Sequence, residues 1–339
     1  MTGHLPRRDV DVLVVGGGVA GATLLHALAR RGADCLLVDE GVGAAAGASS
    51  VPAALLNPNR GRSAKASPAD RAGLTDFWAL TDALAAEGWA TGARRSGVLR
   101  VADNPRQARR WQRLADEPAS GATWLPAAEV PGDYHAPFGA LLVRAGGWVS
   151  PPLLLAALAA SAAALGAPTA RGVGVTGLLE EPTAVAVETT AGPIRARRVA
   201  LCLGAARPPW LRLPRLETVW GEAVVLTTTA TPPYPLAGSV VAAFGPGVAL
   251  VSGGHSATPP TADDAEGAHP LTRALAWQVP AVAQATEVER WRGARAKRAS
   301  GEPVARRLTA RTYLLGALGG RGFLRAATLA TRVAERLNP

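Results

Sequence analysis

The chain has 339 residues, of which 48% are hydrophobic and 18% charged, so it has material for a large folded core and lacks the composition of a disordered protein. Its length suits two domains or one large composite unit. The formal net charge is +10, but nearly all basic residues are arginines in a chain rich in alanine, glycine and proline, which indicates coding bias more than nucleic-acid binding; an anionic macromolecular partner stays open.

Residues 12–39 have the pattern of a strand, a glycine turn, a helix and a second strand. The first strand is a continuous apolar run, typical of a parallel strand covered on both faces. Gly16, Gly18 and Gly21 follow in G-x-G-x-x-G spacing, which permits a tight turn, close approach of a pyrophosphate, and packing of the helix on the strand. Asp39 ends the second strand, where a carboxylate meets a ribose hydroxyl. The segment therefore predicts a dinucleotide site at a helix N-terminus.

A small, polar, glycine-rich loop follows at residues 41–50 and contains Ser49 and Ser50. Its position beside the glycine turn favours a segment that wraps a cofactor. An ordinary surface connection is the alternative interpretation.

The next part of the chain is expected to contain three helices and two strands. We predict helices at residues 70–88, 104–114 and 150–165 and strands at residues 97–101 and 140–143. The second helix carries a cluster of arginines, which we interpret as a solvent-exposed face: Arg106, Arg109, Arg110 and Arg113.

A return to the first sheet is indicated at residues 200–205, an apolar strand that runs into a glycine. The nucleotide-binding domain is therefore expected to be interrupted by an insertion and then resumed. Other elements are predicted as short strands at residues 173–178 and 184–188, a strand-rich segment at 210–254, a helix at 271–286, a strand at 291–295, and a glycine turn at 316–322 before a helix that ends near 337.

Cys35 and Cys202 both fall in predicted buried strands, so they resemble small core residues and cannot form a metal site alone. The five histidines are scattered, and His255, beside two glycines, is the one that we would test for a catalytic role. We expect no metal, no secretory signal and no membrane span, and hence a cytoplasmic protein.

Five blocks in order resemble the FAD-dependent amine and amino-acid oxidoreductases of the D-amino acid oxidase superfamily. These blocks are the nucleotide unit at 16–39, the G-W-V-S-P sequence at 147–151, the strand at 199–205, W-x-G-x-R at 291–295 with G-x-P at 301–303, and L-G-G-R-G-F at 318–323. The resemblance implies an α/β fold, with a Rossmann-like FAD-binding domain and an inserted, mostly antiparallel β-sheet substrate domain. It places the FAD-binding domain at residues 8–75, 146–208 and 304–339, and the substrate domain at residues 76–145 and 209–303.

The resemblance also implies non-covalent FAD held by glycine turns and strand ends. The residues that match the cofactor-binding positions of the family are Gly16, Gly18, Gly21, Asp39, Ser49, Ser50, Val175, Gly204, Gly319, Gly320 and Gly322. The last three would present backbone N–H groups to the flavin, where a positive helix end stabilises the anionic reduced form.

Arg295 matches a family arginine that binds the substrate carboxylate, for which the planar guanidinium is well suited. A surface ion pair is the alternative, because Arg290, Arg292, Lys297 and Arg298 lie nearby in sequence. The implied chemistry is hydride transfer from a carbon bearing nitrogen to flavin N5, which requires no catalytic side chain. The substrate would be a small amine or amino acid.

Two further functions stay open. The L-G-G-R-G turn and the loop at 52–58 are similar to the oxidase domain of the bifunctional enzyme that completes methylaminomethyl-thiouridine in tRNA. That resemblance implies oxidation of a carboxymethylaminomethyl-type base, with tRNA as partner. The family histidine of the last glycine turn is replaced near Leu318, and a family aspartate near Ser300. These departures favour the second alternative, a non-catalytic flavoprotein subunit.

Overall fold

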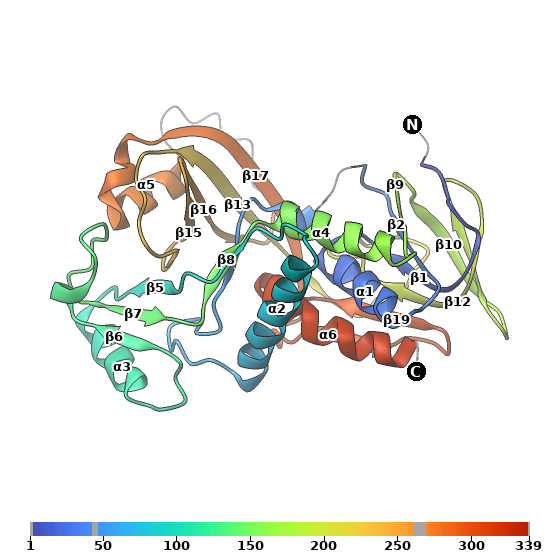
Figure 1. The fold of residues 1–339 in the computed structure, drawn as a ribbon, viewed down its shortest axis with the longest axis horizontal. Coiled ribbons are helices and arrows are strands. Elements are labelled where there is room, and N and C mark those ends of the chain that lie inside the picture. Colours follow the sequence, from blue (N-terminus) through green and yellow to red (C-terminus); the bar gives the residue numbers. More distant parts are fainter. Residues whose placement is uncertain (1–2, 43–46, 260–268, 338–339) are drawn as a thin grey trace.

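The computed structural model describes residues 3–42, 47–259 and 269–337. Two large sheets occupy opposite ends of the molecule, and most helices cover the sheet that contains the N-terminal strand (Figure 1). A three-stranded sheet lies between them and consists of β3 (Ala54–Leu56), β8 (Gly147–Val149) and β4 (Ala93–Arg94).

The first sheet has eight strands and a parallel centre. Strand β1 pairs in parallel with β2 and β12, β2 with β9, and β12 with β19, whereas β10, β11 and β18 join in antiparallel orientation. The strands are β1 (Asp9–Val15), β2 (Cys35–Asp39), β9 (Thr169–Arg171), β10 (Val175–Glu180), β11 (Val185–Thr189), β12 (Ile194–Leu201), β18 (Val304–Arg307) and β19 (Thr312–Gly316).

Alternation along β1 divides the core of this sheet into two layers. Val12 and Val14 pack with helices α1 (Val19–Ala29) and α6 (Gly322–Leu337), while Leu13 and Val15 pack on the opposite face with β11 and β12. Helices α2 (Pro68–Ala86) and α4 (Pro151–Ala164) extend the helical layer, and both begin with proline in the first turn.

The second sheet is antiparallel except for one parallel pair, β5 with β14. Its order is β17-β13-β16-β15-β14-β5-β7-β6. The strands are β5 (Val98–Val101), β6 (Thr123–Leu125), β7 (Ala140–Val143), β13 (Glu217–Thr227), β14 (Leu236–Ala237), β15 (Val241–Gly245), β16 (Val248–Ser256) and β17 (Thr286–Lys297). Helices α3 (Pro105–Ala115) and α5 (Pro270–Gln278) pack at its far end.

This architecture confirms the predicted fold class, including the interrupted parallel sheet and the mostly antiparallel second sheet. The helix predicted at 271–286 is wrong in its second half. Helix α5 ends at Gln278 because Pro280 lacks an N–H and restricts Val279, and a 3₁₀ turn leads to β17. The domain boundary expected after residue 75 lies within α2, so the proposed division between domains stays a prediction.

Candidate active site

A cavity of about 760 Å³ lies where the two sheets meet. From the first sheet it is lined by the segments that follow the carboxyl ends of β1, β2, β12 and β19. From the second sheet it is lined by residues of β13, β16 and β17. Ligands of open α/β sheets bind in this position, outside the carboxyl ends of parallel strands.

The first glycine turn leaves no room for side chains. Gly16 has a φ of +103°, and a Cβ there would lie 2.5 Å from the carbonyl oxygen of Cys202. A Cβ on Gly21 would lie 1.8 Å from the Gly16 carbonyl oxygen, so glycine permits the close contact of α1 with the turn. Gly18 is the N-cap of α1, and the Ser49 hydroxyl accepts a hydrogen bond of 3.0 Å from the N–H of Val19.

The carboxylate of Asp39 is fixed at the end of β2. Its Oδ1 accepts a hydrogen bond of 2.8 Å from the Gly41 N–H, and its Oδ2 accepts one from the Gly17 N–H. Asp39 therefore links the strand end to the glycine turn and lines the cavity. This is the arrangement that a dinucleotide-binding strand uses to reach a ribose hydroxyl.

Most of the residues predicted to bind the cofactor line this one cavity. They are Gly16, Gly18, Asp39, Ser49, Val175, Gly204, Gly319, Gly320 and Gly322, which come from segments far apart in the sequence. Gly21 and Ser50 are not among the described lining residues. Gly21 packs behind the turn, and the Ser50 hydroxyl accepts a 2.7 Å hydrogen bond from Trp291 Nε1.

The second glycine turn, residues 317–322, connects β19 to α6. Ala317 and Gly319 both have a φ of +55°, and Leu318 forms an antiparallel bridge with Lys297 at the end of β17. Positive φ is costly at Ala317, so the surrounding structure must hold this turn in place. The turn is therefore tied directly to the strand that carries Arg295.

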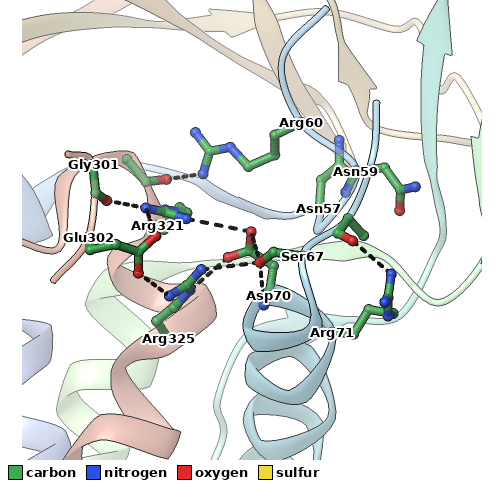
Figure 2. Close-up of polar contacts among 12 residues, drawn as sticks. Asn57, Asn59, Arg60, Ser67, Asp70, Arg71, Gly301, Glu302, Arg321 and Arg325 are labelled. Atoms are coloured by element: carbon green, nitrogen blue, oxygen red, sulfur yellow. Dashed lines mark hydrogen bonds and ion pairs between the residues drawn. The ribbon is translucent and has the colours of Figure 1, made fainter. Parts of the chain in front are cut away.

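A polar cluster beneath this turn joins α2 to α6 (Figure 2). Arg325 Nε donates a 2.7 Å hydrogen bond to Asp70 Oδ1, forming an ion pair in which both side chains are under 10% exposed. Arg321 lies 3.6 Å from Asp70 and 3.5 Å from Glu302, and it donates to the Gly301 carbonyl. Burial opposes ionisation of Asp70, but the hydrogen bonds from Arg325 and Ser67 outweigh it and lower the pKa of the carboxyl group.

Arg295 reaches the cavity from β17. Its Nη2 donates a 3.1 Å hydrogen bond to the Gly254 carbonyl, and burial lowers the pKa of the guanidinium. Among the described residues, no carboxylate lies within 4 Å of it, whereas Arg290, Arg292 and Lys297 pair with glutamates. The ion-pair alternative therefore applies to those neighbours, and the Arg295 side chain retains the capacity to bind an added carboxylate.

His255 lies on the cavity wall near Arg295. Burial and the charges of Arg295, Lys297 and Arg60 lower its pKa, so its imidazole is neutral at pH 7. Cys202 also lines the cavity, where burial raises the thiol pKa to about 12 and leaves it an unreactive core group.

Sequence reasoning missed two lining arginines, Arg60 and Arg100. Arg100 lies in β5, where burial lowers its pKa to about 10, and its guanidinium stacks 4.7 Å from the Trp111 ring. Neither arginine belongs to a recognisable sequence motif. The one indication of a functional position near Arg60 is the polar loop at residues 57–63.

The described parts of the chain contain neither a metal site nor a membrane-spanning helix. No group of three or more histidine, cysteine, aspartate or glutamate side chains there is placed to hold a metal ion. No helix in those parts combines the length and apolar character that crossing a bilayer requires.

Comparison with known proteins identifies the family. The family model described as FAD dependent oxidoreductase (DAO) matches residues 11–336. A tRNA 5-methylaminomethyl-2-thiouridine biosynthesis bifunctional protein MnmC from Maricaulis maris is 32% identical over 99% of this chain and 53% of its own length. The protein of the same name from Paracidovorax citrulli is 31% identical over 67% of this chain and 38% of its own length. The chain spans about half or less of these relatives.

Solved structures share the fold. Glycine oxidase from Geobacillus kaustophilus has a TM-score of 0.84 at 24% identity and covers 97% of this chain and 95% of its own. Iminodiacetate oxidase from Chelativorans sp. BNC1 has a TM-score of 0.76 at 22% identity, covering 95% and 94%. The glycine cradle, the strand-end carboxylate and the cavity volume fit an extended dinucleotide. The chain therefore belongs to the DAO family of FAD-dependent oxidoreductases.

Proposed function

We propose that this enzyme oxidises a C–N bond of an amino acid or secondary amine that carries a carboxylate. The observation that carries this proposal is the Arg295 guanidinium, which faces the cavity beside the second glycine turn without a carboxylate partner among the described residues. A substrate carboxylate would supply the missing counter-charge and orient the reacting carbon.

Bound FAD would supply the hydride acceptor for the carbon attached to nitrogen, and hydrolysis of the resulting imine by water would complete the reaction. Gly16, Gly18 and Asp39 would hold the adenosine and pyrophosphate end of the cofactor, and Gly319 and Gly320 would lie against the flavin. The remaining steps depend on the side chains that surround the amine.

The cationic groups of this end of the cavity also influence the protonation of the amine. Arg60 and Arg295 both line the cavity, and neither pairs with a described carboxylate. Until a carboxylate pairs with them, these guanidinium groups disfavour an ammonium ion nearby, so they would lower the pKa of an amine entering the cavity toward the neutral form that can lose hydride. His255, already neutral, would not add to this repulsion.

The test is an anaerobic titration of the FAD-loaded protein with glycine, sarcosine, proline and D-amino acids, followed by the visible flavin spectrum. We expect at least one carboxylate-bearing amine to bleach the flavin absorbance, while the matching amine without a carboxylate does not. A spectrum that stays oxidised with every member of the panel would reject small-molecule amine oxidation.

The second candidate is oxidation of a modified base in tRNA, as the names of the relatives suggest. A specific surface favours it, because four exposed arginines form one face of α3: Arg106, Arg109, Arg110 and Arg113. The opposite face of α3 packs against the loop that carries Arg60 and Gly61 to the cavity, since Trp111 Nε1 donates a 3.2 Å hydrogen bond to the carbonyl oxygen of Arg62 in that loop.

Bulk tRNA carrying the carboxymethylaminomethyl modification would then bleach the flavin where small amines do not, and its affinity would fall steeply with salt. A lack of both effects would reject this candidate.

A further inference from the structure

The guanidinium groups of Arg60 and Arg295 meet at Gly320, although the two residues come from different parts of the fold. A Cβ on Gly320 would lie 2.9 Å from Arg60 Nη2 and 3.6 Å from Arg295 Nη1, so these nitrogens can be no farther apart than the sum of those distances. Burial, followed by the charge of Arg321 and then that of Arg295, lowers the pKa of the Arg60 guanidinium, while Asp70 opposes this shift. The absence of a side chain at Gly320 provides the space that both occupy.

Neither guanidinium is neutralised within the described part of the chain. Arg60 donates to the Gly320 carbonyl and Arg295 to the Gly254 carbonyl, and no described carboxylate lies within 4 Å of either. Arg321 and Arg325, which lie close by, are instead paired with Asp70 and Glu302 (Figure 2). Asp70 acts on Arg60 only from beyond ion-pair distance, so the described part of the cavity has two adjacent guanidinium groups without a directly paired carboxylate.

The backbone around Arg60 is held on both sides. The Arg100 guanidinium donates hydrogen bonds to the carbonyl oxygens of Asn59 and Gly61, and the second bond is 2.8 Å long. The side-chain amide of the buried Asn59 donates a 2.9 Å hydrogen bond to the Ala64 carbonyl oxygen. The Arg60 residue itself is exposed, so its position depends on the loop that carries it. Arg60 is thus presented to the cavity from a rigid loop.

We propose that Arg60 and Arg295 together bind a dianionic substrate, a secondary amine with a carboxylate on each of its two N-substituents. This inference rests on the proposed function and specifies its substrate class. Arg295 would hold the carboxylate next to the oxidised carbon, and Arg60 would hold the carboxylate of the other arm. Two adjacent guanidinium groups that repel each other when empty become mutually compatible once two carboxylates lie between them.

The experiment compares two unreactive ethers that differ in one carboxylate. Oxydiacetate is a dianion and methoxyacetate a monoanion, and both have an ether oxygen where the amine nitrogen would be. Affinities are measured on the FAD-loaded protein by the change in the flavin spectrum and, independently of the flavin, by calorimetry. The variants are Arg60→Met, Arg60→Lys, Arg295→Met and a matched control, Arg62→Met, whose exposed side chain does not line the cavity.

Wild type and Arg62→Met should bind oxydiacetate at least about tenfold more tightly than methoxyacetate, which is the value of one charge-assisted contact. Arg60→Met should abolish this preference without weakening methoxyacetate, Arg60→Lys should restore part of it, and Arg295→Met should weaken both ligands. Equal affinities in the wild type would overturn the proposal, as would a preference that survives in Arg60→Met.

A different role for Arg60, contact with the flavin alone, predicts that Arg60→Met alters the flavin spectrum of the ligand-free protein and affects both ethers equally, and that result also overturns the proposal. Failure of the proposed function is a separate result, because it appears as absent bleaching with every carboxylate-bearing amine, whereas ether binding requires no turnover.

Discussion

Replacement of Asp70 by asparagine should destabilise the protein strongly, because Asp70 is the buried anion that joins α2 to α6. Its ion pair with Arg325 is 2.7 Å long, and Arg321 lies 3.6 Å away. Removing one partner of a buried pair costs 3–5 kcal/mol of unfolding free energy. Glu302 remains 3.1 Å from Arg325 and compensates part of that loss, so we expect about 3 kcal/mol for Asp70→Asn.

The matched control is Asp82→Asn on the same helix. Asp82 pairs with Arg95 at 2.8 Å, but both side chains are at least half exposed, and such pairs contribute less than about 1 kcal/mol. Urea denaturation of the two variants at pH 7 measures both losses. Similar losses for Asp70→Asn and Asp82→Asn would refute the reasoning that burial gives the Asp70 pair its value.

The pH dependence of the same difference provides a second check. The folded state lowers the pKa of Asp70, so its contribution to stability is present above the pKa of an unfolded aspartate, about 3.9, and disappears as the pH falls through the folded value. The gap between wild type and Asp70→Asn should therefore be complete at neutral pH and close on strong acidification. A gap that stays constant into acid would contradict an electrostatic origin.

Three other substitutions test the cofactor, substrate and nucleic-acid assignments. Gly18→Val should yield protein without bound FAD, because its Cβ would lie 3.1 Å from the Ser49 hydroxyl and its methyl groups would fill the approach to α1; a flavin spectrum of normal intensity would reject the site. Arg295→Met should weaken benzoate about tenfold or more while FAD stays bound, and unchanged benzoate affinity would remove Arg295 from the substrate site. If tRNA is the substrate, a double variant of Arg109 and Arg113 to alanine should reduce the salt dependence of tRNA binding by about two phosphate contacts, and an unchanged slope would exclude this face of α3.

The sequence by itself determined the cofactor end of the site. The strand, turn, helix and second strand at residues 9–39 form one contiguous unit, so their pattern can be recognised from the sequence alone. The contact of Gly21 with the Gly16 carbonyl is local, whereas the close contact of Gly16 with Cys202 is made only in the folded sheet. The turn before α6 was predictable for the same reason, because glycines and a following helix are local features. Glycine turns and the helices that follow them are encoded by residues close together in the sequence, so they can be predicted without knowledge of the tertiary structure.

At the opposite end of the cavity, the sequence suggested Arg295 but only the tertiary structure showed which charged side chains meet there. Arg60 and Gly320 are 260 residues apart, and Asp70 and Arg325 are 255 apart, so no local pattern links them. Among several arginines on and near β17, only the pairing of strands identified Arg292 as the partner of Glu222, and it left Arg295 without a carboxylate partner among the described residues. Charge compensation depends on which side chains meet in space, and that depends on the packing of the two sheets around the cavity.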